Sequence, residues 1–295
     1  MVQNMLPQGF RVGRYEIDRL LGAGQVGATY LARDIGSGAP VAIKELILRG
    51  LALRADDGSI VPITAEDAEP FERCREVFVD EARALAAIKH PNLVRTLDVF
   101  AANGTAYAVM EPIDGASLSE LIQAHGALSA GDTGLVIDAL LDALAAIHAA
   151  GRLHLEVTPM NILADLEGRP VLLGSARVQR ALALAKPVLG GVPVPRYAAF
   201  EQYDTDDQSL GPWTDIYGLA ATARRLVGDA VPEDAVARLN AATQGDADPC
   251  PPLAALAPAG YAPAFLAALD AGFAVMPADR PQSIADWRAR FPLPA

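Results

Sequence analysis

Cysteine is nearly absent from this chain. The 295 residues include only two cysteines, Cys74 and Cys250. Two isolated cysteines cannot form the disulfide framework that supports small secreted domains, and they offer too few thiolates for a cysteine-based metal site. Stability must therefore come from a hydrophobic core, for which a chain of this length is sufficient.

Positive charge is also scarce. The chain has 24 lysines and arginines against 36 aspartates and glutamates, which gives a formal net charge of −12. An acidic surface repels nucleic acid and anionic lipid, and the sequence has no local basic patch that would reverse this effect. We therefore expect no nucleic-acid partner.

Long hydrophobic runs and targeting signals are missing as well. The longest apolar helical stretch, near 135–150, is interrupted by Asp138 and Asp142, so it is not typical of a membrane span. The N-terminal residues MVQNMLPQGF lack a basic segment followed by an apolar run, which argues against a signal peptide. With 52% apolar and 20% charged residues, the composition is that of an ordinary globular protein, and we expect a cytoplasmic one without membrane association.

The first part of the chain has the alternation of short β-strands. A polar stretch at 55–70 predicts a loop with a small hairpin, and a helix over 78–88 has one apolar face and ends at His90-Pro91. Asn103-Gly104 predicts a hairpin turn. The expected strands cover 14–22, 27–34, 40–46, 93–100 and 105–111.

Helical periodicity dominates after Asp114-Gly115. A helix over 128–151 is predicted to end at Gly151, a typical C-cap glycine. There is no internal repeat and no coiled-coil heptad pattern. Further helices are expected at 214–227, 233–243, 263–274 and 283–290. The sequence thus predicts a β-rich part followed by an α-rich part, with the boundary near 111–116.

Two motifs of the first part have chemical meaning. GAGQVG at 22–27 is a G-x-G-x-x-G pattern between two predicted strands, which argues against a dinucleotide fold, where the motif opens a helix. A cluster of turn glycines is the plainer interpretation. Lys44, in VAIKEL, follows about 20 residues later. A lone strand lysine is usually solvated, but the combination of the two motifs is specific.

The third motif is HLEVTPMN at 154–161, between the predicted helix ending at Gly151 and the apolar pair Ile162-Leu163. It resembles the catalytic loop of eukaryotic-type protein kinases, H-R-D-x-K-P-x-N. His154, Pro159 and Asn161 fit the pattern. Four more segments match that family: HPNLV at 90–94, YAAFEQY at 197–203, GPWTDIYGL at 211–219 and PADRPQS at 277–283.

The resemblance spans roughly residues 14–291. The chain is similar to bacterial eukaryotic-like serine/threonine protein kinases. It implies an α+β, two-lobed protein-kinase-like fold with one major helix in the β-rich N-lobe and an α-helical C-lobe. The corresponding division is an N-terminal extension at 1–13, an N-lobe at 14–113 and a C-lobe at 114–295. The chain ends soon after Arg280 with FPLPA, so we expect a freestanding protein.

The resemblance also assigns roles to residues of the nucleotide site. Gly22, Gly24 and Gly27 would approach the phosphates, and Lys44 would contact the α- and β-phosphates and pair with a helix carboxylate. Glu81 is the candidate for that carboxylate because it opens an E-A-R pattern, although Asp80 competes with it. Met110 stands as gatekeeper, and Glu111 to Ile113 form the hinge. In the C-lobe, Asp215 would hold the catalytic loop, and Glu201 would pair with Arg280.

Several residues that perform phosphoryl transfer in the family are absent here. Glu156 stands at the position of the catalytic aspartate; it is still a base, but one methylene longer. The metal-binding aspartate of D-F-G falls on Gly174 in an ungapped count, or on Leu172 if GSAR is matched to D-F-G-S-A-R, and neither is a carboxylate. Asn161 remains as a metal ligand, but one amide oxygen alone makes a poor Mg²⁺ site.

The segment that corresponds to the activation loop, residues 178–196, contains no serine, threonine or tyrosine. Leu155 replaces the arginine that grips a phosphorylated loop in many kinases, Thr158 replaces the catalytic-loop lysine, and Val194 replaces a threonine. The loop is instead apolar, which indicates either a partner interface or a segment that folds onto the protein. Its apolar residues are Leu182, Leu184, Val188, Leu189, Val192 and Val194.

The retained architecture and the lost chemistry together predict a pseudokinase, a non-catalytic regulator or scaffold in bacterial phospho-signalling. We expect weak binding of ATP or ADP that does not require Mg²⁺, and a protein partner such as a kinase or a kinase substrate. The alternative is a divergent serine/threonine kinase that transfers the γ-phosphate with Glu156 as base. A third interpretation, a transferase that binds ATP in a flipped orientation, rests on Lys44 alone.

Overall fold

The computed structural model describes residues 5–292 apart from 188, 190–193, 205–206, 229 and 257–258. The chain forms two compact units. Unit 1 consists of Met1–Lys89, Val94–Ile113 and Arg177–Gly191. Unit 2 consists of His90–Leu93, Asp114–Ala176 and Val192–Ala295. The main part of unit 1 thus ends inside the interval where the sequence predicts the change of class.

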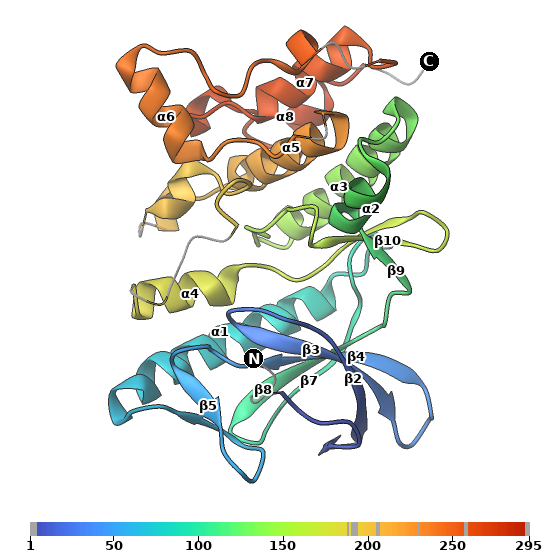
Figure 1. The fold of residues 1–295 in the computed structure, drawn as a ribbon, viewed down its shortest axis with the longest axis vertical. Helices are drawn as coiled ribbons and strands as arrows, with labels where there is room; N and C mark the ends of the chain where they lie inside the picture. The colour runs from blue at the N-terminus through green and yellow to red at the C-terminus, as the bar shows by residue number, and fades with distance from the viewer. Residues whose placement is uncertain are drawn as a thin grey trace. The chain divides into compact units, whose positions relative to one another are not determined.

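Unit 1 contains a six-stranded antiparallel sheet (Figure 1). Residues of β3 alternate between buried and partly exposed positions, and buried Tyr30 and Ala32 mark the core face. In sheet order, the strands are β1 (Arg11–Val12), β2 (Tyr15–Ala23), β3 (Gly27–Asp34), β4 (Pro40–Leu46), β8 (Thr105–Met110) and β7 (Thr96–Ala102). The turn predicted at Asn103-Gly104 joins β7 to β8, and both of its residues have positive φ.

Residues 5–13, which the resemblance assigns to an N-terminal extension, belong to unit 1. Strand β1 pairs with β2, and Leu6 is buried in the core. The backbone N–H of Leu6 donates to the Tyr30 hydroxyl at 3.1 Å. This short apolar stretch was missed because two strand residues and one buried leucine are too few to produce a periodic pattern.

Helix α1 (Ala68–Ala87) is longer than the predicted 78–88 and begins ten residues earlier. A 3₁₀ turn, η1 (Ala65–Asp67), precedes it, and Thr64 donates to the Asp67 carboxylate from its N–H (3.1 Å) and hydroxyl (2.7 Å). Phe71, Cys74 and Phe78 are buried in the core of unit 1, so the apolar face extends back through residues 71–77, for which the sequence predicts no element.

The hairpin expected in the polar stretch is present as β5 (Ala52–Arg54) and β6 (Ile60–Pro62). It is attached to the main sheet by a buried ion pair, in which Arg54 Nη2 lies 2.6 Å from Glu45 Oε2. The Tyr30 and Tyr107 hydroxyls donate to the same carboxylate at 3.1 and 2.7 Å. Burial, followed by the charge of Glu45, raises the pKa of both tyrosines, so they remain neutral donors.

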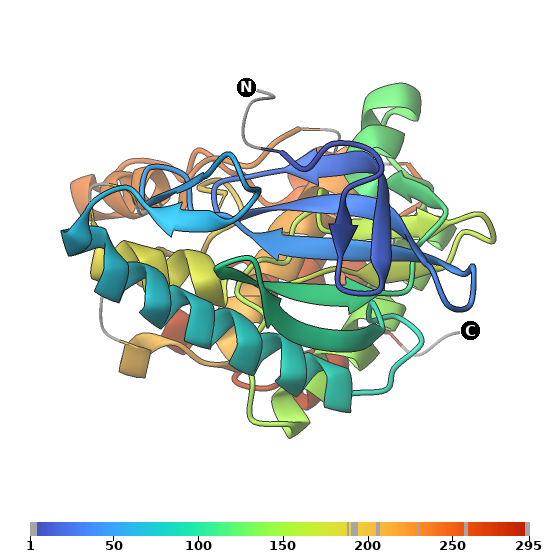
Figure 2. The ribbon, with the colours of Figure 1, turned by 90° about the horizontal axis from the view of Figure 1, so that it is seen from below.

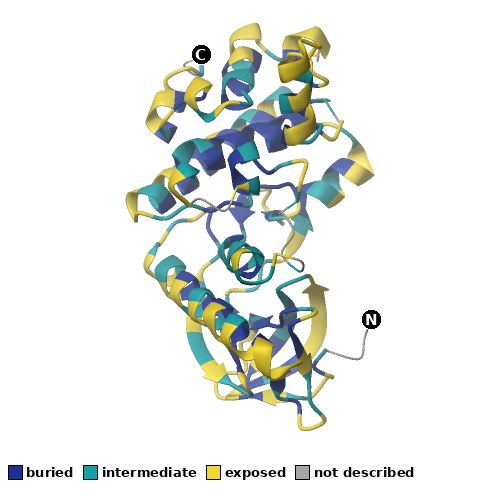
Figure 3. Cartoon of the chain, turned by 90° about the vertical axis from the view of Figure 1, so that its left-hand side faces the viewer, coloured by how far each residue is buried: buried dark blue, intermediate teal, exposed yellow. Residues whose placement is uncertain are grey.

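Unit 2 is built mainly of helices around α5, which has buried residues on all sides (dark blue in Figure 3). Its strands are β9 (Gly115–Ser117), β10 (Ile162–Asp165) and β11 (Pro170–Leu172), in the order β11-β10-β9. Its longer helices are α2 (Leu118–His125), α3 (Ala130–Ala149), α5 (Pro212–Gly228), α6 (Ala235–Gln244), α7 (Pro263–Gly272) and α8 (Ile284–Arg288). Four of these correspond to the helices predicted at 214–227, 233–243, 263–274 and 283–290.

The helix ends of unit 2 follow recognisable local signals. Gly151 (φ 68°) follows the last turn of α3, and its N–H donates to His148 O while that of Arg152 donates to Ile147 O, a Schellman ending that confirms the predicted cap. Helix α2, which the sequence reading missed, begins with a capping box between Ser117 and Glu120.

Residues 177–185, predicted as part of a loop, form helix α4 (Arg177–Ala185) in unit 1. Figures 1 and 2 both show α4 beside α1, against which it packs. The sequence RVQRALALA consists largely of good helix formers and contains no glycine or proline before Pro187, which explains why the segment is helical. Val188 and Val192 of the predicted apolar loop lie outside the described residues.

In the part of the chain that the structure describes, no helix combines the length and apolar character that crossing a bilayer requires.

The buried Glu45–Arg54 pair gives a stability prediction. Arg54→Ala leaves the Glu45 carboxylate buried with the guanidinium removed, which should lower the free energy of unfolding by about 3–5 kcal/mol. The matched change Arg73→Ala removes an exposed ion pair with Glu69 and should cost less than about 1 kcal/mol. Urea unfolding of both variants measures the difference, and equal losses would contradict the predicted role of Arg54.

Candidate functional site

The three glycines of GAGQVG lie at the tip of the β2–β3 hairpin, where Gly24 N–H donates to Gly27 O at 2.8 Å. They differ in what a side chain would meet. A Cβ on Gly27 would overlap the carbonyl oxygen of Glu45, so this glycine is required by packing alone. A Cβ on Gly22 or Gly24 would meet nothing within 4 Å, which leaves the backbone there open to a ligand.

Lys44, the predicted phosphate contact, projects from β4 on one face of the sheet together with the gatekeeper Met110. The register places Lys44 opposite Thr29 and Ala108, and Ala42 opposite Met110. Residues directly opposite each other, and those two apart on one strand, share a face. The sheet of unit 1 therefore brings Lys44 and Met110 onto one surface, with Gly22 opposite Thr29 at its edge.

The expected hinge follows at the end of β8. Glu111 N–H donates to Arg95 O at 3.0 Å, and its carboxylate pairs with Arg95 at 2.7 Å on the surface. This amide is therefore committed to the protein's own backbone. Ile113 ends the main part of unit 1.

Glu81 and Asp80 were the two candidates for the carboxylate that pairs with Lys44. Glu81 is 5% exposed and Asp80 is exposed, which favours the choice of Glu81. Glu81 forms an ion pair with Arg177 of α4, whose Nε lies 3.2 Å from Oε2. Nothing in the sequence indicates this contact of Arg177, because the residue is far from Glu81 along the chain and no helix is predicted at α4.

Asp215 of α5 holds the backbone of the HLEVTPMN segment through hydrogen bonds. Its carboxylate accepts from His154 N–H at 2.8 Å and from Leu155 N–H at 2.6 Å. His148 Nε2 lies 2.8 Å from the same carboxylate, and because an ionised carboxylate only accepts, that nitrogen carries the proton. Asp215 is 1% exposed, so these donors replace the solvent that the charge has lost.

Leu155 adopts a left-handed conformation (φ 65°) that is unusual for a leucine. Its backbone is held on both sides, since its N–H donates to Asp215 and its carbonyl accepts from Gln202 Nε2 at 2.9 Å. Gln202 also accepts from Ala199 N–H, again at 2.9 Å. Sequence reasoning missed Gln202 and His148. Gln202 directly follows Glu201, and that adjacency is the signal that could have indicated it.

The remaining catalytic-loop residues form a bonded turn. His154 Nε2 donates to Leu173 O at 2.8 Å, and its Nδ1 accepts from Glu156 N–H at 3.2 Å. Asn161 Nδ2 donates to Glu156 O at 3.1 Å, so the amide braces the loop in addition to any role toward a metal. Thr158 is buried, and its hydroxyl has no hydrogen-bond partner among the described residues.

Neither position proposed for the missing D-F-G aspartate carries a carboxylate: one is Leu172 and the other is Gly174. Leu172 ends β11, is 1% exposed, and donates its N–H to Asn92 O at 2.9 Å. Leu173 N–H donates to Asn161 O at 2.8 Å, and Gly174 follows with φ 35°. Within the described residues, no three His, Cys, Asp or Glu side chains are grouped so that they could hold a metal ion.

The predicted structural pair of Glu201 and Arg280 is present and buried. Arg280 Nη1 and Nη2 lie 2.7 and 3.1 Å from the two carboxylate oxygens, and the side chains are 0% and 2% exposed. Arg280 also donates to the carbonyl oxygens of Ala274 and Val275, and Thr214 donates to Glu201 at 2.9 Å. All polar partners of this buried pair therefore come from unit 2.

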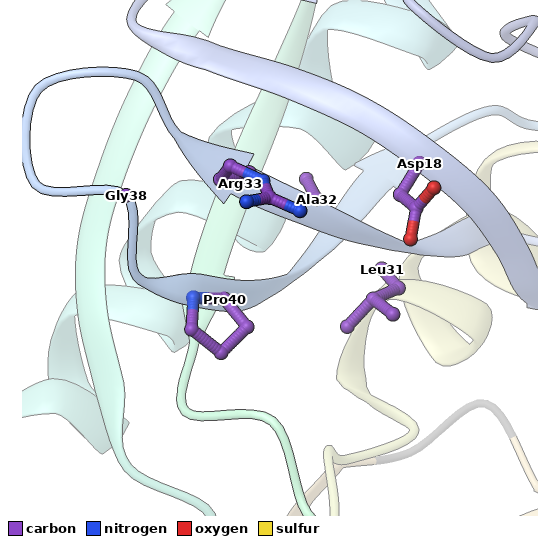
Figure 4. Close-up of a pocket in the computed structure, with 6 residues that line it drawn as sticks. All are labelled: Asp18, Leu31, Ala32, Arg33, Gly38 and Pro40. Carbon is purple, nitrogen blue, oxygen red and sulfur yellow. The ribbon is translucent and has the colours of Figure 1, made fainter.

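A shallow pocket of about 220 Å³ lies on β2–β4 of unit 1 (Figure 4). Asp18 occupies the β-bulge between Ile17 and Arg19, and Leu31 is opposite Ala42. The lining residues are Asp18, Leu31, Ala32, Arg33, Gly38 and Pro40, and none of them is a predicted site residue.

The loop anchor gives the second prediction. Asp215→Asn keeps the shape but exchanges one acceptor oxygen for a donor that faces N–H groups, so it should lower the free energy of unfolding by about 2–4 kcal/mol. Asp138→Asn on the exposed side of α3 is the control, expected to change stability by less than about 1 kcal/mol. Thermal unfolding compares the two, and an unchanged melting temperature for Asp215→Asn would refute the role assigned to Asp215.

Comparisons with known proteins agree with this geometry. The protein kinase domain model matches residues 15–235. Serine/threonine-protein kinase Pkn1 of Myxococcus xanthus is 30% identical over 95% of this chain and 38% of its own length. PknD of Mycobacterium tuberculosis is 30% identical over 97% of this chain and 40% of its own, and PrkC of Bacillus subtilis is 29% identical over 75% and 31%.

A solved structure titled "PpkA-294 apo form" is 32% identical, with a TM-score of 0.86, and the match covers 98% of this chain and 100% of that one. The chain spans less than half the length of each of the three curated relatives named above. The predicted fold, a β-rich N-lobe and a helical C-lobe, is confirmed. The chain belongs to the protein kinase domain family and is related to the bacterial serine/threonine kinases.

Proposed function

We propose that this protein is a pseudokinase, a non-catalytic regulator or scaffold that acts in the cytoplasm in bacterial phospho-signalling. The observation that carries the proposal is the apolar run Leu172-Leu173-Gly174, which stands where the family has its metal-binding aspartate. Leu172 is a buried strand residue and Gly174 has no side chain, so no carboxylate occupies the position in either alignment.

The rest of unit 2 supports the same proposal. The contacts that are retained hold the loop and the fold: Asp215 with the loop backbone, and Glu201 with Arg280. The side chains that would act on a phosphoryl group are changed, to Glu156 and Thr158. Phosphoryl transfer depends almost entirely on positioning and on charge stabilisation, and the missing groups are those that supply charge.

Protein kinase domains generally bind ATP with Mg²⁺. The residues present here do not fit the metal, because Asn161 is left without the D-F-G carboxylate and Mg²⁺ prefers carboxylates combined with phosphates. They fit a nucleotide better, since Lys44 and Met110 share one face of the sheet and the backbone is open at Gly22 and Gly24. We therefore propose weak binding of ATP or ADP that does not depend on metal.

A divergent kinase with Glu156 as base is the second candidate, and the intact catalytic-loop backbone favours it. His154, Glu156 and Asn161 are joined by hydrogen bonds, so a carboxylate remains on an ordered loop. Transfer of phosphate from labelled ATP to a generic protein acceptor tests this alternative. Transfer that disappears in Glu156→Ala would establish it, and would overturn the pseudokinase proposal.

The third prediction concerns nucleotide binding. Calorimetric titration of ATP should give the same dissociation constant, within about twofold, in Mg²⁺ and in EDTA, because the metal adds little affinity at a site without its carboxylate. Lys44→Ala should weaken ATP at least about tenfold through loss of a charge-assisted phosphate contact. Arg33→Ala, on the same strand pair but farther from the glycines, is the matched control and should bind like the unchanged protein.

The outcomes separate the candidates. Binding that appears only with Mg²⁺ would favour the divergent kinase. Absence of binding in both buffers would leave a scaffold whose function resides on its surface, and affinity unaffected by Lys44→Ala would show that the nucleotide does not occupy the face carrying Lys44.

A further inference from the structure

Helix α4 fills an apolar surface of unit 1. Val178 and Leu182, one turn apart, are 6% and 0% exposed and belong to the same core cluster as Phe71, Cys74 and Phe78 of α1. Leu184 on the other side of α4 is 43% exposed. One face of the helix is therefore buried against the rest of unit 1 through an i, i+4 pair, and the other face is exposed. We call the surface that receives it the α1 groove.

Each end of the groove carries an acidic residue that meets a basic residue of the segment. Arg177 Nε lies 3.2 Å from Glu81 at one end, and Lys186 Nζ lies 2.8 Å from Asp67 at the other. Lys186, followed by Thr64, lowers the pKa of the Asp67 carboxyl, and Asp67 raises the pKa of Lys186. The groove thus fits a helix that carries an apolar stripe and a positive charge at each end.

Beyond α4, Leu189 extends the contact to the glycine motif. Gln25 Nε2 donates to Leu189 O at 3.4 Å and to Arg49 O at 3.2 Å. The Leu189 side chain lies against Gly50, where an added Cβ would come within 2.9 Å of it. Helix α4, Lys186 and Leu189 therefore contact three parts of unit 1: α1, the segment after β4, and the tip of the glycine hairpin.

We infer that the α1 groove is a docking site for a basic amphipathic helix of a partner protein, and that residues 177–189 are its resident occupant. The recognised pattern is the one this segment presents: apolar residues at positions i, i+4 and i+11, with basic residues at i−1 and i+8. In this chain these are Val178, Leu182, Leu189, Arg177 and Lys186. The inference rests on the proposed function, for which it names the partner.

Two observations favour a partner helix that competes with the segment. Residues 178–196 contain no serine, threonine or tyrosine, so phosphorylation within them cannot release the segment. The groove ends in Glu81 and Asp67 on a chain of net charge −12, which attracts a basic helix and repels an acidic one. A helix with the same pattern would displace residues 177–189 by mass action.

Displacement also has a consequence for nucleotide binding. The same segment holds Glu81, the carboxylate assigned to Lys44, and Gln25 at the glycine hairpin. Exchange of the residue that meets Glu81 therefore reaches the nucleotide face, and any change that the partner makes in nucleotide affinity is matched by linkage with an equal change that the nucleotide makes in partner affinity.

The fourth prediction uses two variants of the full chain that carry the same chemical change. Leu182→Asp places a charge in the groove and should release the segment, whereas Leu184→Asp changes an exposed position of the same helix. The probe is a fluorescently labelled peptide with the sequence of residues 176–190, followed by anisotropy. The peptide should bind Leu182→Asp at least about tenfold more tightly than it binds the unchanged protein or Leu184→Asp, because their groove is occupied.

A charge reversal tests the orientation of the occupant. A peptide with Arg177→Glu should bind the Leu182→Asp protein about tenfold more weakly, and adding Glu81→Arg to that protein should restore the affinity. If Leu182→Asp does not fold, the full-length Arg177→Glu variant replaces it, since that side chain is 37% exposed and the change only weakens the segment.

Equal peptide binding by all three folded proteins, or binding indifferent to the charge at 177, would overturn the docking inference. Peptide binding requires neither nucleotide nor phosphoryl transfer. Phosphate transfer that depends on Glu156, together with peptide binding in the groove, would therefore reject the pseudokinase function and keep the docking site. Absence of phosphate transfer, together with absence of peptide binding, would keep the pseudokinase function and reject the docking site.

Discussion

The arrangement of the catalytic loop depends on one buried carboxylate. Asp215 accepts hydrogen bonds from two consecutive loop amides, and those amides fix Leu155 in a left-handed conformation that a leucine does not adopt by preference. Because Gln202 holds the carbonyl of the same residue, the loop is fixed from two sides. The backbone conformation is thus held independently of the side chain at position 156, where the family has its catalytic base.

This separation of backbone from side chain explains how a kinase fold can lose its chemistry without losing its structure. The Asp215 bonds and the Glu201–Arg280 pair involve neither Glu156, Thr158 nor the residues at 172 and 174. Changes at positions 156, 158, 172 and 174 therefore leave no buried charge of these contacts uncompensated. Removing one partner of a buried ion pair such as Glu201–Arg280 leaves the other charge unpaired and strongly lowers the stability of the fold. The residues that brace the fold are therefore retained together, even where the residues that act on phosphate differ.

Much of this could be predicted from the sequence because the residues concerned interact through motifs with recognisable spacing. The strands that carry the glycines and Lys44, the end of α3 at Gly151, Asp215 and the Glu201–Arg280 pair all follow from such motifs. The start of α1 could not be predicted, because its apolar residues are sparse and lie among polar ones. Helix α4 was not predicted either, because the resemblance to kinases assigns residues 178–196 to a loop. The Glu81–Arg177 ion pair was beyond reach since it depends on α4 being folded.

The structure of α4 explains why residues 178–196 are apolar and contain no hydroxyl side chain, because part of this segment packs into the core of unit 1. A loop controlled by phosphate needs a hydroxyl and an arginine that grips the product. Residues 178–196 contain no Ser, Thr or Tyr, and Leu155 stands at the position of the arginine. Phosphate control acts by creating charge, whereas apolar packing is controlled only by what else can cover the same surface. With Val178 and Leu182 in the core of unit 1 and a basic residue at each end of α4, the segment is held by contacts that another helix can imitate. A segment without a hydroxyl for covalent control is thus suited to the proposed control through competition between helices for the α1 groove.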